Sequence, residues 1–371
     1  MKILFLVQGE GRGHLTQAIA LGQILRKQGH DIVGAMVGTS KGRVIPSFFE
    51  EQINTSIFYF DGLNIIYKAD GTGMNLPKTI VTHLAHAQKY LKSLSSIHKT
   101  VARIQPDLII SFYEIFGGLY KFIHRSDIPL ICVAHQYLLL HPKFTFPEKS
   151  LFNRFLININ SRATSLFSVK RLALSFRPMP SRPDLKLTVV PPLLRNAVLC
   201  LQATTEDFIL VYLTHHSLSQ QIIDWHLAHA NVRLHCFWDN PNTSQEFHFD
   251  ETLTFHRING QKYLQMLASC KALATTAGFE SVCEAMYLGK PVMMVPVPNH
   301  FEQECNALDA VISGAGVRSK TFDLTIILNY LPTHKKDTER FRHWYKEGTK
   351  MFVEEIGNFD HTKKAKEPAL N

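Results

Sequence analysis

Three glycines and one histidine lie close together near the start of the chain, in the stretch QGEGRGHLT (8–16). The preceding apolar run predicts a buried strand, and the spacing of apolar residues in 15–31 predicts a helix. Gly11 and Gly13 then lie in a strand-to-helix turn, where backbone without Cβ atoms can approach a ligand closely. His14 would begin the helix, whose dipole lowers the pKa of an imidazole, so a neutral ring there can act as a general base. A tight turn with His14 as a helix cap is the simpler alternative.

The glycine pattern differs from two common phosphate-binding loops. The dinucleotide motif G-x-G-x-x-G would need a glycine where His14 stands. Asp31 lies at the start of the second predicted strand, so it is not placed to bind the ribose of NAD. A Walker A loop would need G-K-[ST] after the glycines. The stretch is therefore not predicted to bind nucleotides in either of these ways.

A second group of polar residues occupies 275–307. A predicted strand ends at Thr276, Gly278 makes a turn, and a helix begins near Phe279. The free N–H groups in the first turn of that helix are a natural seat for a diphosphate. Glu284 lies further along the same helix, where its carboxylate can accept both hydroxyls of a ribose.

Polar residues also follow two further predicted strands. Glu302 and Gln303 begin a helix after the strand 291–297, and a carboxylate beside an amide can fix several sugar hydroxyls at once. His215 directly follows the strand 207–213. It is placed either for a phosphate contact or in a solvated loop.

Strand and helix patterns alternate along the chain, which predicts an α/β fold with doubly wound parallel sheets. The length of 371 residues favours about two domains. We expect domains at 1–195 and 196–371 with a ligand cleft between them. A proline-rich connection is predicted at 180–195, and an amphipathic helix at 337–359 is expected to cross back to the first domain. The other predicted elements are strands at 2–7, 31–38, 106–111, 128–135, 232–238 and 271–276 and helices at 78–105, 217–231, 261–270 and 279–288.

The composition is that of an ordinary globular protein, with 45% apolar and 19% charged residues. The six cysteines are scattered without a C-x-x-C pair, so neither a disulfide framework nor a cysteine zinc site is expected. The apolar start is too short for a signal peptide, no run is long enough for a membrane span, and no nucleic-acid-binding motif is present. These features favour the reducing cytoplasm and give no reason to expect a nucleic-acid partner.

The net charge of +9 is unevenly distributed. Between Lys143 and Arg195 there are ten Lys or Arg but only two acids, Glu148 and Asp184, and apolar stretches alternate with these charges. One interpretation is a solvated basic face over ordinary core residues. The other is a surface for an anionic membrane or a lipid-phosphate acceptor.

The pentapeptide HLAHA occurs twice, at 83–87 and 226–230. Each copy places two histidines three residues apart on a predicted helix, a spacing that some metal sites use. No carboxylate lies at a helpful spacing in either copy. We therefore expect ordinary surface histidines.

The order of motifs in 275–307 resembles the donor-binding signature of GT-B fold glycosyltransferases. That order is a turn and helix with AGFES and Glu284, then G-K-P (289–291), then the Glu–Gln pair and N-A (306–307). The resemblance is to the nucleotide-sugar clan that includes plant glucosyltransferases and the peptidoglycan lipid-intermediate N-acetylglucosaminyltransferase, and most of all to bacterial and archaeal glycosyltransferase-like proteins. It covers the glycine–histidine turn and most of 254–307. It implies a GT-B fold, with two Rossmann-like domains facing each other across a cleft.

The resemblance also implies roles for the matching residues. His14 would deprotonate the acceptor hydroxyl, and Glu114 would replace an aspartate that orients this base in many relatives. Glu284 would bind the ribose, and Glu302 with Gln303 would hold the transferred sugar. The other implied donor-binding residues are Thr276 and Gly278 at the diphosphate, Arg257 and Ile258 at the base through their backbone, and Gly11, Gly13, His215, Phe279, Glu280 and Ser281.

Two features depart from the family pattern. The plant enzymes have a histidine where Thr276 stands, so a hydroxyl and backbone groups would have to contact the phosphate here. The strand 207–213 is followed by THHSLSQ rather than by a glycine-rich turn. That departure weakens diphosphate binding on this side or gives it to His215.

The function implied is transfer of a hexose from a nucleotide-sugar, expected to be a UDP-sugar, to an acceptor hydroxyl with inversion. Neither a metal nor a cofactor is expected, because helix dipoles and N–H groups can stabilise the leaving diphosphate. The acceptor is expected to be lipid-linked or membrane-associated, and the protein to lie in the cytoplasm, at the inner face of the membrane. A sugar-nucleotide 2-epimerase on the same fold and a non-catalytic nucleotide-sugar-binding protein are the alternatives.

Overall fold

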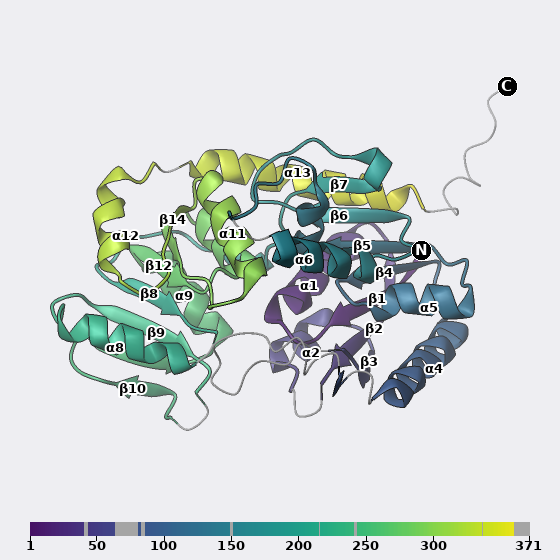
Figure 1. Ribbon diagram of the computed structural model, residues 1–371, viewed down its shortest axis with the longest axis horizontal. Coiled ribbons are helices and arrows are strands. Elements are labelled where there is room, and N and C mark those ends of the chain that lie inside the picture. Colours follow the sequence, from purple (N-terminus) through teal and green to yellow (C-terminus); the bar gives the residue numbers. More distant parts are fainter. Residues whose placement is uncertain are drawn as a thin grey trace.

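The computed structural model describes residues 1–40, 44–63, 81–82, 86–148, 151–214, 216–240, 243–335 and 337–359. Within these residues the strands form two seven-stranded sheets with helices packed around them (Figure 1). All pairings are parallel except one at an edge of the second sheet. The expected α/β fold class, with two Rossmann-like sheets, is confirmed.

The first sheet is built around β1 (Lys2–Gln8), in which residues 3–7 are fully buried. Continuous aliphatic runs of this kind suit a strand that is covered on both faces. The sheet order is β3 (Ile57–Asp61), β2 (Asp31–Thr39), β1, β4 (Leu108–Phe112), β5 (Leu130–Ala134), β6 (Lys170–Leu174) and β7 (Leu187–Val190). The helical elements of this half are α1 (Arg12–Lys27), α2 (Ser47–Ile53), α4 (Ala87–Ile104), α5 (Phe116–His124), η1 (His135–Leu140), α6 (Leu151–Thr164), η2 (Pro183–Leu185) and α7 (Asn196–Leu199).

The second sheet repeats the same layout, with one antiparallel strand added at its edge. Its order is β10 (Glu246–His248), β11 (Leu253–Arg257), β9 (Leu234–Trp238), β8 (Ile209–Tyr212), β12 (Ala272–Thr275), β13 (Val292–Met294) and β14 (Gly316–Arg318). The helical elements are η3 (His216–Leu218), α8 (Ser219–Leu227), α9 (Gly260–Ser269), α10 (Phe279–Tyr287), α11 (Phe301–Ile312), α12 (Thr325–Tyr330), η4 (Leu331–Thr333) and α13 (Thr338–Gly357).

The strand order reverses at one point in each sheet, between β1 and β4 in the first and between β8 and β12 in the second. Connections that leave the carboxyl ends of the strands diverge at such a point and open a crevice for a ligand. The glycine–histidine turn follows β1, and the Thr276 turn follows β12. The topology therefore places both predicted motifs at the edges of the sheets where ligands bind.

The proline-rich segment 180–195 is only partly a connection. Leu187–Val190 forms β7, which pairs in parallel with β6 at the edge of the first sheet. The prediction of a plain linker over this range is therefore wrong, because an edge strand tolerates flanking prolines that a central strand would not. The chain leaves the sheet at Pro191 and Pro192. The domain boundary near residue 195 stays a prediction.

The final helix α13 contacts both halves and runs along one side of the molecule toward the first sheet (Figure 1). Near its start, Arg342 donates from Nε to the carbonyl of Tyr287 on α10, 2.9 Å away. Trp344 donates from Nε1 to the carbonyl of Ser175, just after β6, over 2.9 Å. Near its end, Glu355 forms an ion pair with Lys170 on β6, so the helix joins α10 to the first sheet.

Trp344→Phe should lower the free energy of unfolding by about 1–3 kcal/mol, because the buried Ser175 carbonyl would lose its donor. Urea unfolding of the variant and the wild type measures the difference. His343→Phe changes an exposed neighbour on α13 and serves as the matched control. Equal stabilities for Trp344→Phe and the wild type would show that this contact does not help to fasten the helix.

Candidate active site

His14 lies in the first turn of α1 and is only 7% exposed. Its Nδ1 lies 3.2 Å from Oε1 of Gln17, and its ring stacks on Tyr113 with centroids 5.6 Å apart. Burial lowers the pKa of His14 to about 4, although the contact with Gln17 acts in the opposite direction. The imidazole is therefore neutral at pH 7, as a general base must be.

Two glutamine side chains connect His14 to helices of the second sheet. Gln17 donates from Nε2 to Oε1 of Glu280, on α10. Gln136, in η1 after β5, donates from Nε2 to Oε1 of Glu302 over 3.0 Å, and the same Nε2 lies 3.5 Å from His14 Nε2. The structure thus brings His14, Glu280 and Glu302 together, although they come from distant parts of the chain.

Both carboxyl groups have pKa values close to neutral. Burial raises the pKa of Glu280 to about 7, while the hydrogen bond from Gln17 lowers it. Burial also raises the pKa of Glu302 to about 7, and the charge of Glu280 raises it further. Because the two groups repel when both are ionised, a proton gained by one favours ionisation of the other.

The turn before α10 presents backbone groups to the same region. Ala277 has a φ of +58°, a left-handed conformation that is uncommon outside glycine, and Asn306 donates from Nδ2 to its carbonyl over 3.2 Å. Gly278 is the N-cap, and among the described residues no side chain caps this helix; Ser281 donates from Oγ to the Gly278 carbonyl. The first-turn N–H groups of α10 are thus left without a side-chain cap, as a diphosphate seat requires.

Thr276 and Glu284 each have a protein partner already. Thr276 donates from Oγ1 to Oγ1 of Thr214, 3.1 Å away, which joins the segments after β12 and β8. Both carboxylate oxygens of Glu284 accept from Arg195, over 2.6 Å from Nε and 2.7 Å from Nη2. A ribose would therefore have to share the Glu284 carboxylate with Arg195 or displace it.

Glu114 does not orient His14, contrary to the role expected for it. Its carboxylate accepts from the N–H of Phe116 over 3.2 Å and lies against β2, where a Cβ on Gly38 would be 2.3 Å from Oε2. Burial raises the pKa of Glu114 to about 8. Tyr113, which has a φ of +58°, takes the place beside the His14 ring, and Gln17 bonds its Nδ1.

The ring of Phe279 packs between the two halves. Its ring stacks on His135 with centroids 3.9 Å apart, and it lies 4.6 Å from the ring of Phe176. Both partners follow strands of the first sheet. The side chain of Phe279 therefore makes an apolar contact that holds α10 against the first half, and its predicted donor-binding role can rest only on its backbone N–H.

The backbone N–H groups of Arg257 and Ile258 are both used within the second sheet. Arg257 donates to the carbonyl of Gln245 over 3.0 Å, and Ile258 donates to the carbonyl of Trp238 over 3.2 Å. These two residues can therefore present only their carbonyls to a nucleotide base, so the predicted reading of uracil would depend on acceptors alone.

Three predicted residues remain: Gln303, Gly11 and His215. Gln303 accepts at Oε1 from the N–H of Val297 over 2.8 Å, so its amide oxygen is occupied. A Cβ on Gly11 would meet no described atom within 4 Å, so packing does not require a glycine there. His215 lies outside the described residues.

Sequence reasoning does not single out Gln17, Gln136 or Arg195. Gln17 lies one helical turn after His14, so its spacing is a usable signal. Gln136 directly follows the predicted strand 128–135, at the end of the strand where ligand-binding residues gather. No local signal marks Arg195, because its contact with Glu284 joins residues that are 89 positions apart.

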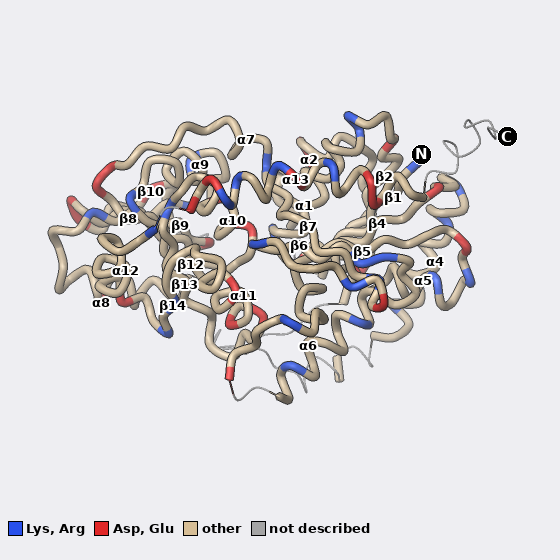
Figure 2. The backbone as a smooth tube through the Cα atoms, turned by 90° about the horizontal axis from the view of Figure 1, so that it is seen from above, with Lys and Arg blue, Asp and Glu red and all other residues tan. Residues whose placement is uncertain are grey.

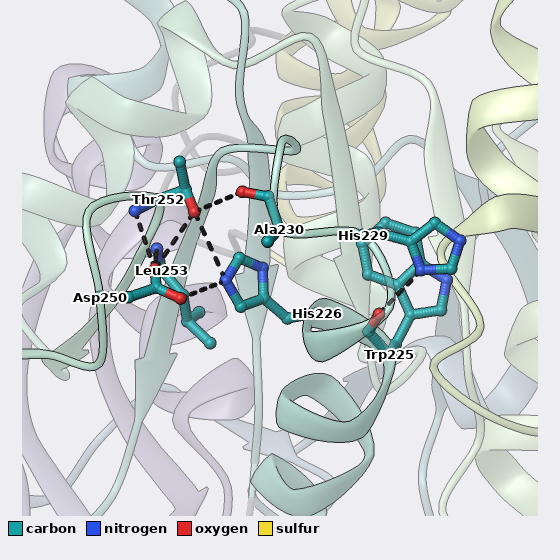
Figure 3. A network of polar contacts seen from close by, with 7 residues as sticks. All are labelled: Trp225, His226, His229, Ala230, Asp250, Thr252 and Leu253. Carbon is teal, nitrogen blue, oxygen red and sulfur yellow. Dashed lines mark hydrogen bonds and ion pairs between the residues drawn. The ribbon is translucent and has the colours of Figure 1, made fainter.

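In the second HLAHA copy, His226 makes a structural contact within the protein. His226 is fully buried in α8, with Nε2 2.7 Å from Oδ2 of Asp250 and a hydroxyl contact to Thr252 (Figure 3). The expectation of a surface histidine is wrong for His226, because it joins α8 to the turn between β10 and β11. His83, in the first copy, lies outside the described residues. In the described part of the chain, no three His, Cys, Asp or Glu side chains are grouped so that they could hold a metal ion.

The fold is that of a glycosyltransferase of the GT-B class. The family model described as glycosyl transferase family 1 matches residues 1–333, so the chain belongs to that family. None of the curated proteins matches the chain.

Several solved glycosyltransferases share the fold. The glycotransferase of kitacinnamycin has a TM-score of 0.63 and 15% identity, covering 96% of this chain and 98% of its own. UGT2 of Phytolacca americana, complexed with UDP-2fluoro-glucose and pterostilbene, has a TM-score of 0.64 and 13% identity, covering 97% and 100%. MurG of Acinetobacter baumannii has a TM-score of 0.57 and 15% identity, covering 96% and 100%. At these identities the likeness shows the shared fold.

Glu114→Gln should make the free energy of unfolding fall less as the pH rises. The folded-state pKa of Glu114 is about 8, above its ordinary value of 4.5, so the folded chain holds a proton that the unfolded chain releases. Its contribution to stability is complete below about pH 4.5 and is lost as the pH rises toward 8. Between pH 5 and 8 the wild type should lose on the order of a few kcal/mol more than the variant, as measured by urea unfolding.

Glu347→Gln removes an exposed acid on α13 and is the control for the loss of one carboxyl group. If Glu114→Gln and the wild type lost the same free energy of unfolding between the two pH values, the buried carboxyl of Glu114 would not be protonated in the folded chain.

Proposed function

We propose that this glycosyltransferase moves a hexose from a UDP-sugar to an acceptor hydroxyl, without a metal ion and with inversion. His14 takes the acceptor proton on Nε2 while the acceptor oxygen attacks the anomeric carbon. The bond between that carbon and the diphosphate oxygen breaks, and UDP leaves with the electron pair. One displacement of this kind inverts the configuration at the anomeric carbon.

The observation that carries this proposal is the buried, neutral imidazole of His14 between two carboxyl groups of the other half. Gln17 contacts both His14 and Glu280, and Gln136 contacts both His14 and Glu302. Direct transfer needs a base beside the acceptor and oxygen atoms that hold the sugar close to it. His14 in the first half and the two carboxyl groups in the second half have this arrangement.

The proposed donor lies across the carboxyl ends of the second sheet. The uncapped first turn of α10 would receive the diphosphate and stabilise the charge that develops on it. Glu302 and Gln303 would bind the hexose, and Glu284 would bind the ribose in competition with Arg195. The neighbouring structure of UGT2 holds UDP-2fluoro-glucose, which supports a UDP-sugar as the donor here.

The proposed acceptor is carried by a lipid, and the surface that meets the membrane is the outer face of α6. Four apolar side chains, which we call the α6 face, are exposed along this helix: Leu151 (82%), Phe152 (68%), Phe155 (60%) and Ile159 (48%). The helix carries two arginines and no acid, and it lies at the edge of the molecule in Figure 2. Apolar residues flanked by basic ones suit an anionic bilayer surface, which supports the proposed position of the protein at the cytoplasmic face of a membrane.

The opposite side of α6 contacts the neighbours of His14. Asn160 donates from Nδ2 to the hydroxyl of Tyr113 over 3.0 Å, and Ser161 donates from Oγ to the carbonyl of Gln136 over 3.3 Å. An acceptor held in a membrane at the α6 face would therefore enter close to the base. No helix in the described ranges is long and apolar enough to cross a bilayer.

His14→Ala should reduce sugar transfer by about 10²–10⁴-fold while the fold is retained, because general base assistance contributes about that factor. The measurement is nucleoside diphosphate release from UDP-, GDP-, CDP- and dTDP-sugars, with and without a lipid extract. Lipid-dependent release from UDP-sugars is the expected result for the wild type.

His98→Ala, at an exposed histidine on α4, is the matched control for loss of an imidazole. Near-full transfer by His14→Ala would overturn the base assignment. Conversion of the donor without any acceptor would instead indicate an epimerase.

Phe152→Ser combined with Phe155→Ser should weaken binding to anionic vesicles by about tenfold or more, because two exposed aromatic side chains no longer enter the bilayer. Sedimentation with phosphatidylglycerol-containing and neutral phosphatidylcholine vesicles measures this, and bound protein should fall as salt is added. The control is Phe247→Ser with Phe249→Ser, an exposed pair in the second half. Equal binding by the two double variants, or no preference for anionic vesicles, would contradict the membrane role.

A further inference from the structure

Gln17 can satisfy its two neighbours in only one orientation of its amide. Its side chain lies between the Nδ1 of His14 and the carboxylate of Glu280. An ionised carboxylate only accepts hydrogen bonds, so the amide NH₂ group must face Glu280. The amide oxygen must then face His14.

The orientation of Gln17 selects one tautomer of His14. An amide oxygen cannot donate, so the Nδ1 that lies 3.2 Å from it must carry the ring proton. A neutral imidazole has only one ring proton, so Nε2 keeps a lone pair. Gln136 agrees with this from the other side, because its NH₂ group donates to Glu302 and is also the group that faces Nε2.

Gly13 makes the approach of Glu280 to α1 possible. A Cβ at this position would lie 2.4 Å from Oε2 and 2.7 Å from Cδ of Glu280. Any side chain on residue 13 would therefore push the carboxylate away from Gln17. This close approach explains why the third glycine of the QGEGRGH stretch has no side chain.

We propose that Glu280 is a positioning residue, which acts through Gln17 to hold His14 as the Nδ1–H tautomer with its Nε2 lone pair available. Because Glu280 belongs to the second half and His14 to the first, the base reaches this state only when the two halves are together. The tautomer does not depend on the proposed function; the use of Nε2 as the base does.

The charge of Glu280 controls this arrangement. Protonated Glu280 can donate a hydrogen bond, so Gln17 can reverse its amide and Nδ1 loses its fixed acceptor. The charged and titratable groups around Glu280 are His14 on α1, Glu284 on α10, Glu302 on α11 and Arg195. Burial raises the pKa of Glu280 to about 7, and the pKa of Glu302, which holds Gln136 at the other ring nitrogen, to about 7 as well. The single tautomer should therefore hold above this pH and give way to a mixture below it.

The test is long-range ¹⁵N–¹H correlation spectroscopy of the full chain with labelled histidine, in which the signal lost in His14→Gln assigns His14. At pH 8 the wild type should show a protonated Nδ1 and an unprotonated Nε2. Glu280→Ala and Gly13→Ala should both reduce this separation, because only the longer contact from Gln136 then favours a protonated Nδ1. The exchange of Gln17→Glu with Glu280→Gln should restore it, because the new carboxylate accepts from Nδ1–H and the new amide donates to that carboxylate.

Gly11→Ala is the control for adding a methyl group in the same turn, because no described atom lies within 4 Å of its Cβ, and it should keep the wild-type tautomer. A wild-type ring protonated on Nε2 would overturn the proposal, and so would a folded Glu280→Ala protein that keeps the Nδ1–H tautomer. Neither result bears on sugar transfer, whose own test is the turnover of His14→Ala.

Discussion

The burial of one imidazole between two carboxyl groups is the interaction on which this site depends. The same removal of water lowers the pKa of His14 and raises the pKa values of Glu280 and Glu302. Burial alone therefore explains why the imidazole is neutral and why both neighbouring carboxyl groups titrate near pH 7. That removal of water requires both halves of the molecule. The electrostatics of the site are therefore a property of the assembled pair of sheets rather than of either sheet.

The elements that position the site follow from local patterns. An apolar strand, a glycine turn and an amphipathic helix are encoded within the first 27 residues, and parallel sheets bring the carboxyl ends of their strands to one edge. The position of His14 and the turn before α10 could therefore be predicted from the sequence. The partners could not. Whether Gln17 or Glu114 meets His14 depends on the turn at Tyr113, and the ion pair of Glu284 with Arg195 depends on how the two halves meet.

Packing between the halves also explains the other differences from expectation. Phe279 follows a turn that resembles a donor-binding loop, yet its ring is used against His135 and Phe176. The basic segment likewise has two roles. Its helix α6 sends polar groups inward to Tyr113 and Gln136 and leaves its apolar residues outside. Periodicity detects such a helix but does not say which side lies against the protein.

The helix α13 has a mechanical consequence. The chain passes from one half to the other after β7 and returns along α13, which bonds Tyr287 on one side and Ser175 on the other. A body held by two separate connections cannot be drawn straight away from its neighbour. Any motion that parts the two halves must therefore bend or detach α13, in addition to breaking the side-chain contacts between them.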